Sequence, residues 1–415
     1  MNKKNKIAII GLGYVGLPLA IAFAKHFRVV GFDINLDRVN DLKNSLDING
    51  DIKFIKNKNV LFTNNITDIS SSNIYIITVP TPVKKDNQPD LSMLEDASRN
   101  VADFLKQGDI VIYESTVYPG VTEDICVPIL EGRSKLKYNI DFYCGYSPER
   151  ISPGAEKHNL ENVVKITSGS NSKVSLIVDD LYNKIIEAGT YRAPNIKIAE
   201  AAKVVENTQR DVNIALMNEL AMMFDKMDID TNQVLEAAKT KWNFLDFKPG
   251  LVGGHCIGVD PYYLLHKSEE SGYIPNLLSS SRKINNSVAG FIVDKTIKLV
   301  LAADKQIRGA NILIFGYTFK ENCADTRNTK VKDIVEGLVS SLCNVDIFDP
   351  YIAPSDNNNF VPLPFNNDVR YDAIIVAVAH NEFFKYSIDD YYKISNGKLV
   401  FLDIKGIYKE STWKL

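Results

Sequence analysis

Short apolar runs separated by helical patterns dominate the first two hundred residues. The segment 7–10 reads as a buried strand, and the largely apolar segment Leu17–Lys25 that follows it predicts a helix. Further strands are predicted at Arg28–Phe32, Ile74–Val79 and Ile110–Tyr113, with helices between them. This alternation is typical of a parallel, doubly wound sheet, so the expected fold class is α/β.

The middle of the chain carries the longest helical signal, over residues 198–228. Apolar side chains recur there at helical spacing. They are Ala199, Ala202, Val205, Val212, Leu216 and Leu220. A second helical region covers about residues 275–303.

The alternation of strands and helices resumes after Gly309. The predicted elements are strands at 312–315, 345–348, 373–378 and 399–402 and a helix at 331–342. We therefore expect two Rossmann-like doubly wound domains joined by a helical middle domain built on the long helix. The expected domain ranges are 1–195, 196–303 and 304–415.

Composition and charge describe a soluble globular protein without a strong surface field. Of the 415 residues, 45% are apolar and 24% are charged, and the net charge is −3. This charge attracts neither nucleic acid nor an anionic membrane, and no apolar stretch reaches the roughly 18 residues of a transmembrane helix. The five cysteines (126, 144, 256, 323 and 343) form no CxxC pair. Their odd number favours the cytoplasm and argues against a disulfide framework or a metal site of the structural zinc type.

A glycine-rich turn follows the first predicted strand and opens the first predicted helix. Its sequence, Gly11-Leu12-Gly13-Tyr14-Val15-Gly16, fits the dinucleotide fingerprint GxGxxG. Gly11 suits the tight turn, Gly13 lets a pyrophosphate approach the backbone, and Gly16 lets helix and strand pack closely. Asp33, which ends the next strand, would bind the adenosine ribose and repel a 2′-phosphate, so it predicts NAD. Arg38 leaves NADP open, and a glycine turn that binds no nucleotide is the remaining alternative.

Cys256 lies in the segment Gly253-Gly254-His255-Cys256. A thiol can hold an aldehyde as a thiohemiacetal, which lets a nicotinamide enzyme carry a primary alcohol through to a carboxylate. The two glycines permit close backbone approach, and Asp260 could serve as a base. His255 is a less suitable base, because adjacent residues in a tight loop often point apart. The alternative for Cys256 is an inert core cysteine.

Lys203 and Asn207 are four residues apart on the long predicted helix, so they share one face. A cation and an amide donor on one face would suit a reaction in which negative charge develops on oxygen. The alternative, which the pair alone favours, is a solvated lysine beside a surface amide.

Taken together, the chain resembles the nucleotide-sugar 6-dehydrogenases, the family that includes UDP-glucose and GDP-mannose dehydrogenases. The resemblance covers nearly the whole chain. It is carried in order by Gly11–Gly16, Val79–Pro82, Glu114–Thr116, Ser147–Arg150, Glu200–Asn207, Gly253–Asp260, Gly316–Lys320 and Asp325–Arg327.

Two segments resemble one branch of this family in particular. Gly253–Leu264 and Ser147–Arg150 look like the branch that acts on UDP-N-acetylhexosamines, whereas UDP-glucose enzymes typically show Gly-Gly-Ser-Cys-Phe-x-Lys-Asp and Pro-Glu-Phe. The Leu251–Gly254 variant is similar to enzymes of Vi-type capsule and O-antigen synthesis, which oxidise UDP-N-acetylglucosamine or UDP-N-acetylgalactosamine.

The resemblance implies a role for each candidate catalytic residue. Cys256 is the nucleophile, and Lys203 and Asn207 stabilise charge on the reacting oxygen and contact the substrate. Asp260 and Glu149 position or activate water. Thr116 orders water near the nicotinamide.

The resemblance also divides the ligands between domains. Residues 1–195 would bind NAD, 196–303 would form a homodimer, and 304–415 would hold the UDP-sugar. Beyond the glycines, Asp33 and Arg38, the implied cofactor contacts are Thr81, Thr116 and Arg327. The implied substrate contacts are Phe244, Leu245, Gly253, Lys320 and Arg282, with core packing as the alternative for Phe244 and Leu245 and a solvated arginine for Arg282.

The expected activity is an NAD-dependent, four-electron oxidation of the C6 hydroxymethyl group of a UDP-N-acetylhexosamine to the uronate, for surface polysaccharide synthesis. The C4 epimer stays open, with a lean to the gluco form. Alternatives are a UDP-glucose or UDP-N-acetylmannosamine 6-dehydrogenase and, from a different class, a non-catalytic NAD-binding redox sensor.

Overall fold

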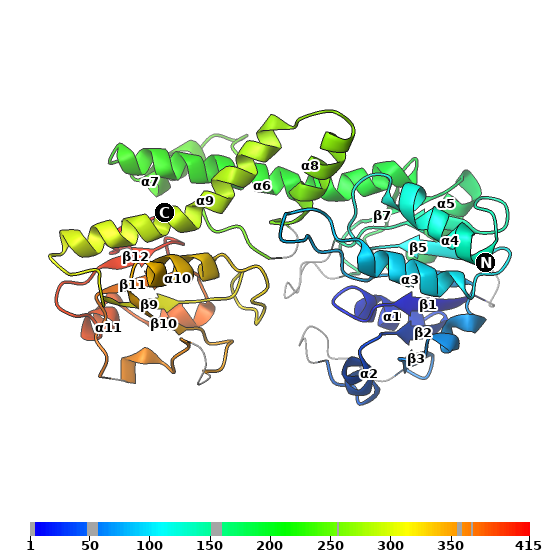
Figure 1. Cartoon of the computed structure of the whole chain (residues 1–415), viewed down its shortest axis with the longest axis horizontal. Helices are drawn as coiled ribbons and strands as arrows, with labels where there is room; N and C mark the ends of the chain where they lie inside the picture. Colours follow the sequence, from blue (N-terminus) through cyan, green and yellow to red (C-terminus); the bar gives the residue numbers. More distant parts are fainter. Residues whose placement is uncertain (1–4, 48–56, 151–159, 255–256, 355–358, 367) are drawn as a thin grey trace. The chain divides into compact units, whose positions relative to one another are not determined.

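The computed structural model describes residues 5–47, 57–150, 160–254, 257–354, 359–366 and 368–415 (Figure 1). The chain divides into two compact units. The first comprises Met1–Glu206 and Tyr262–Tyr273, and the second comprises Asn207–Pro261 and Ile274–Leu415. Among the described residues, no helix is both long and apolar enough to cross a membrane.

The first unit is built on a sheet with the strand order β3-β2-β1-β4-β5-β6-β7-β8. The strands are β1 (Lys6–Ile10), β2 (Arg28–Phe32), β3 (Val60–Thr63), β4 (Ile74–Ile77), β5 (Ile110–Tyr113), β6 (Tyr143–Tyr146), β7 (Lys165–Gly169) and β8 (Thr190–Arg192). The helices are α1 (Gly16–Ala24), α2 (Leu36–Lys43), α3 (Ser92–Ala102), α4 (Val127–Ser134) and α5 (Ser172–Tyr182), with short helical turns η1 (Ile66–Ser71) and η2 (Val121–Cys126).

The predicted parallel arrangement is confirmed from β3 to β6, whose neighbouring strands all pair parallel. Ile7, Ala8 and Ile9 of β1 are fully buried, as expected of a strand covered by helices on both faces. The exception to the predicted direction is β7, which pairs antiparallel with β6.

The long helix predicted over residues 198–228 is α6 (Ile196–Lys226). It is followed by α7 (Thr231–Ala238), α8 (Asp260–Glu270) and α9 (Asn276–Ala302). Not all of the apolar side chains that recur at helical spacing along α6 are buried, because Val205 and Leu216 are about half exposed.

The second unit contains a wholly parallel sheet with the order β10-β9-β11-β12-β13. Val288 and Ile292 of α9 share one buried core with Ile312 of this sheet and Ile334. The elements are β9 (Asn311–Phe315), α10 (Val331–Ser340), β10 (Asn344–Phe348), η4 (Pro364–Asn366), β11 (Ala373–Val376), η5 (Asn381–Lys385), α11 (Ile388–Lys393), β12 (Phe401–Asp403) and β13 (Trp413–Lys414).

Candidate active site

The glycine turn between β1 and α1 has the geometry that a dinucleotide needs. Gly11 has a φ of +95°, which lies in the left-handed region that favours glycine. A Cβ at Gly16 would lie 1.8 Å from the carbonyl oxygen of Gly11, so no side chain fits there. Around Gly13, in contrast, no described atom outside Gly13 and its two chain neighbours lies within 4 Å of the position of a Cβ, which leaves that side open to a phosphate.

Asp33 is fixed beside this turn. Its Oδ2 accepts a hydrogen bond of 2.8 Å from the backbone N–H of Leu12, and its Oδ1 accepts one of 2.9 Å from that of Asn35. Arg38 donates from Nε to the carbonyl of Leu12 and forms a mostly buried ion pair of 2.7 Å with Asp47. Because Asp47 already balances the guanidinium, Arg38 is poorly placed to attract a 2′-phosphate.

Replacing Asp33 with Ala should weaken NAD binding and narrow the preference for NAD over NADP. The variant loses the ribose acceptor, at a cost of about 1–3 kcal/mol, or roughly five- to 150-fold in Kd. Fluorescence titration with both cofactors measures the two values. Asp37→Ala, an exposed carboxylate on α2, is the matched control. A parent protein that prefers NADP would contradict the role given to Asp33.

Two further motif segments meet in the first unit. The hydroxyl of Thr81 donates to the carbonyl of Thr116 at 2.6 Å, and the hydroxyl of Tyr263 donates to the carbonyl of Thr81. The structure thus brings together the two threonines that the sequence assigned to the cofactor. Tyr263 is fully buried, and the sequence did not indicate it as part of this group.

Glu200, on α6, holds the segment that follows Thr116. Its carboxylate accepts hydrogen bonds from the N–H groups of Gly120 (2.6 Å) and Thr122 (3.0 Å). Burial raises the pKa of Glu200 to about 7, against the lowering effect of these hydrogen bonds.

Glu149 lies beyond the carboxyl end of β6, beside a buried cation. One carboxylate oxygen accepts a hydrogen bond of 2.6 Å from the N–H of Arg150. The other lies 3.6 Å from Nζ of Lys165.

Asn207 and Asp260 are in direct contact in the second unit. Nδ2 of Asn207 donates to Oδ2 of Asp260 at 2.5 Å, and both residues are buried. Arg210, one helical turn further along α6, donates to Oδ1 of Asn207. Lys203 is likewise buried on α6, which excludes the solvated lysine considered from the sequence. Cys256 and His255 lie outside the described residues.

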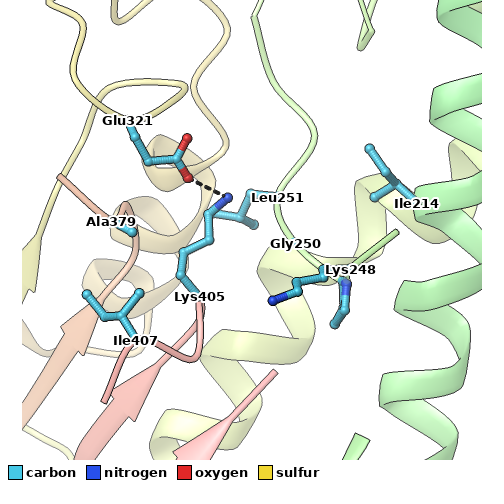
Figure 2. A pocket seen from close by; sticks show the side chains of 9 residues that line it. Ile214, Lys248, Gly250, Leu251, Glu321, Ala379, Lys405 and Ile407 are labelled. Atoms are coloured by element: carbon cyan, nitrogen blue, oxygen red, sulfur yellow. Dashed lines mark ion pairs between the residues drawn. The ribbon is translucent and has the colours of Figure 1, made fainter. Parts of the chain in front are cut away.

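A pocket of about 300 Å³ opens in the second unit (Figure 2). Lys405 and Glu321 form an ion pair of 2.9 Å at its edge, and Lys248 contributes another ammonium group. Because Glu321 balances Lys405, the two lysines leave the lining with a single net positive charge, which favours an anionic ligand such as a diphosphate. The remaining lining residues are Ile214, Pro249, Gly250, Leu251, Ala379 and Ile407.

Gly253 and Lys320 line a small hollow of about 10 Å³ that shares Leu251 and Lys405 with the pocket. The structure therefore brings these two predicted substrate contacts together. Phe244 and Leu245 line neither cavity. Leu245 is 59% exposed, so the alternative that it packs in the core is wrong.

A buried polar chain fixes the pocket loop to α6 and α9. Asn218 accepts a hydrogen bond from the N–H of Gly250 (2.8 Å) and donates one to its carbonyl (3.0 Å). Asn218 also binds Asn285, which donates to Asp211 at 2.7 Å. Arg282 completes the chain through a 2.5 Å ion pair with Asp211 and is only 3% exposed, so the solvated arginine is wrong.

The turn after β9 repeats the geometry of the NAD fingerprint. The N–H of Gly316 donates to the carbonyl of Phe348 at 2.8 Å, as that of Gly11 does to Phe32. Asp349 follows β10 as Asp33 follows β2, and it accepts a hydrogen bond of 2.6 Å from the N–H of Tyr317.

Asp349, however, is closed off by protein groups. Nε2 of His380 lies 3.1 Å from its Oδ2, while Nδ1 accepts from the N–H of Asn322 at 3.0 Å. This pattern assigns the proton of the imidazole to Nε2. Burial opposes ionisation of Asp349, but hydrogen bonds from His380 and Tyr317 outweigh it and lower the pKa of the carboxyl. The second unit therefore does not offer this aspartate to a second dinucleotide.

Arg327 lies on the surface of the second unit, where it forms an ion pair of 2.7 Å with Asp325. Its side chain is exposed, so it is accessible to a phosphate. Its contact with NAD stays a prediction.

Several residues of these groups escaped the sequence analysis, namely Lys165, Arg210, Asp211, Asn218, Asn285, Asp349 and His380. Asp349 directly follows the strand predicted at 345–348, and His380 lies two residues after the end of the strand predicted at 373–378. Because ligands bind at the carboxyl ends of parallel strands, their polar character there was an available signal.

The fold and the site define an NAD-binding oxidoreductase. The sequence matches three domains of one family: the NAD binding domain of the UDP-glucose/GDP-mannose dehydrogenase family over residues 5–186, its central domain over 197–287 and its UDP binding domain over 313–410. The chain belongs to this family, and it is a nucleotide-sugar dehydrogenase that uses NAD.

Two relatives that are about 50% identical to this chain carry a more specific name than the family. The UDP-N-acetyl-D-glucosamine 6-dehydrogenase of Salmonella typhi is 50% identical over 96% of both chains. The enzyme of the same name from Pseudomonas aeruginosa is 49% identical over 98% of both. Among solved structures, a UDP-D-ManNAc dehydrogenase from Pyrococcus horikoshii aligns with a TM-score of 0.88 at 31% identity, covering 99% of this chain and 98% of that one.

Proposed function

We propose that the protein oxidises the C6 hydroxymethyl group of a UDP-N-acetylhexosamine to the carboxylate, with UDP-N-acetylglucosamine as the preferred substrate. The observation that carries this proposal is the identity of 50% and 49% to two proteins named UDP-N-acetyl-D-glucosamine 6-dehydrogenase, over nearly the full chain. The reaction belongs to cytoplasmic synthesis of sugar precursors for a surface polysaccharide such as capsule or O-antigen.

The chemistry proceeds in two oxidations joined by a covalent intermediate. NAD supplies the hydride acceptor for each oxidation. The Cys256 thiolate adds to the C6 aldehyde, and the thiohemiacetal carbon then loses a hydride to become a thioester. Water attacks the thioester, which releases the carboxylate and returns the thiol.

The described residues support this chemistry through fixed polar groups. Asp260 and Arg210 hold the amide of Asn207 from both ends, so its orientation is set before the reaction. Buried Lys203, one helical turn earlier, stabilises negative charge on the reacting oxygen and favours the thiolate. Thr116 and Glu149 order and activate water.

The nucleotide-sugar is held in the second unit. Lys248 of the 300 Å³ pocket attracts the diphosphate, Lys405 contacts it beside its ion-pair partner Glu321, and Lys320 contacts it from the adjoining hollow. Gly253 lets the sugar approach the backbone, and Phe244 with Leu245 contact the sugar or the uracil. Arg282 supports the pocket loop through Asp211 and Asn218.

With one UDP-N-acetylglucosamine consumed, two NADH should form and no free aldehyde should appear. The value of kcat/KM should exceed that for UDP-glucose by at least roughly tenfold, because the smaller sugar leaves polar groups unpaired. Absorbance at the NADH band over a panel of UDP-sugars measures both quantities. One NADH with trapped aldehyde would contradict the covalent mechanism, and equal use of UDP-glucose would contradict the acetamido substrate.

The same assay distinguishes three alternatives. UDP-N-acetylmannosamine is a second candidate, because the 31% identical Pyrococcus protein carries that activity in its name. UDP-N-acetylgalactosamine differs only at C4 and belongs in the same panel. A redox sensor without turnover would form no NADH with any of them.

We also propose that the enzyme is a homodimer joined through its helical middle. Leu216 and Met223 on α6, and Met227 directly after its end, are between 44% and 56% exposed. A second copy would bury this surface.

A further inference from the structure

Three side chains behind Glu149 form a buried, charged cluster that the proposed reaction does not use. Nζ of Lys165 lies 2.6 Å from Oε2 of Glu114 and 3.6 Å from Oε2 of Glu149. The hydroxyl of Tyr182 donates to the other oxygen of Glu114. Lys165 is only 2% exposed, and Glu114 only 1%.

The antiparallel strand β7 explains this arrangement. In its pairing with β6, Ser168 is opposite Tyr146, and continuing that register by three residues places Lys165 opposite Glu149. Glu114 directly follows β5, which pairs parallel with β6, so it ends at the same sheet edge. A parallel β7 would have carried its first residue to the opposite edge.

Together with Glu149, the cluster places two carboxylates around one ammonium group. The carbonyl of Pro148 takes a further hydrogen bond of 3.0 Å from Nζ, so the ammonium group is held on three sides. Burial alone would lower the pKa of Lys165, but Glu114 and Glu149 outweigh it and raise that pKa. Burial raises the pKa of Glu114, and the neighbouring ammonium group of Lys165 opposes that rise.

We propose that Lys165, held in place by Glu114, is a positioning residue that orients Glu149 and sets a positive charge beside its carboxylate for its role with water. This inference rests on the proposed role of Glu149. Among the described residues, the charged or titratable groups around Glu149 include Lys165 on β7, Glu114 after β5, Tyr182 on α5 and the adjacent Arg150. Arg150 is itself paired with Glu206 of α6 at 2.6 Å.

The test compares two substitutions that should act in opposite directions. In Glu114→Gln, Glu149 is the only carboxylate left beside the charge of Lys165. The acid limb of the kcat/KM profile should therefore move to lower pH. Lys165→Met leaves the carboxylates facing each other without a cation, so that limb should move to higher pH. Each shift should be roughly one pH unit or more, the size expected for a charge within 4–6 Å.

Controls separate positioning from damage to the fold. Lys165→Arg keeps the positive charge, so it should retain most of the parent pH profile. Lys173 is an exposed lysine on α5, and Lys173→Met should leave the profile unchanged. Should Lys165→Met fail to fold, the nearly isosteric Glu114→Gln decides alone. Shifts in the same direction, or an unmoved limb in Glu114→Gln, would overturn the inference.

Glu149→Gln distinguishes this inference from the proposed function beneath it. If this variant loses turnover and its pH profile loses the acid limb, the role of Glu149 on which the inference depends is supported. Retention of both would remove Glu149 from the reaction, and the inference with it, while the production of NADH by the parent protein would stand.

Discussion

Cys256→Ser is expected to lower kcat by about a thousandfold or more while NAD binding stays unchanged. A serine hydroxyl is far less acidic than a thiol of pKa about 8.5, so it provides almost no anion to attack the aldehyde. Without capture of the aldehyde, residual turnover should stop after the first oxidation. Steady-state kinetics, the yield of NADH per sugar and fluorescence titration with NAD measure the three effects.

Cys343→Ser is the matched control for this experiment. Cys343 is buried in the second unit, where its thiol contacts the carbonyl of Ile307 at 3.6 Å. The exchange of sulfur for oxygen is the same, but it should leave kcat close to that of the parent. Near-normal turnover of Cys256→Ser would instead remove Cys256 from the mechanism and return it to packing.

Arg282→Met should lower the free energy of unfolding by about 3–5 kcal/mol, the range for breaking a buried ion pair. Asp211 would keep a carboxylate that is almost fully buried without its ion-pair partner. Burial already raises the pKa of Asp211 against the opposing effect of Arg282, and removing that effect raises it further. The folded variant therefore binds a proton that the unfolded chain releases, and its deficit grows as the pH rises through the folded pKa.

Urea denaturation followed by circular dichroism at two pH values measures both the loss and its pH dependence. Lys283→Met, an exposed lysine beside Arg282 on α9, should cost little. Replacing Asp211 with Leu in the Arg282→Met background should recover part of the stability, because no charge is then left unpaired. A loss below about 1 kcal/mol at both pH values would contradict a structural role for the pair.

The sequence predicted the elements of the fold well because buried parallel strands are continuous apolar runs. The strands at Arg28–Phe32 and Ile110–Tyr113 were predicted to the residue. The direction of β7 could not be predicted, because the sequence of a buried strand looks the same whether the neighbouring strand runs parallel or antiparallel to it. Leu399 and Val400 are buried but precede β12, so their apolar character extended the predicted strand too far.

Within the site, residues with a signature of their own were easier to predict than residues that act through a partner. Gly16 stands out because a fixed spacing demands it, and the structure leaves no room for a Cβ there. Asn218, by contrast, matters only because Gly250 lies across from it, 32 positions along the chain. A single sequence gives the identity of such a residue but not its neighbour.

The closure of Asp349 by His380 affects how the protein keeps two similar ligands apart. Both NAD and a UDP-sugar present a ribose and a diphosphate, and both units of the chain place a glycine turn and an aspartate at the end of a parallel sheet. Only in the first unit is that aspartate exposed enough to recognise a ribose. His380 thus makes two similar turns unequal. Its hydrogen bond occupies the aspartate of the second unit, so that turn offers no free ribose acceptor to a second molecule of NAD.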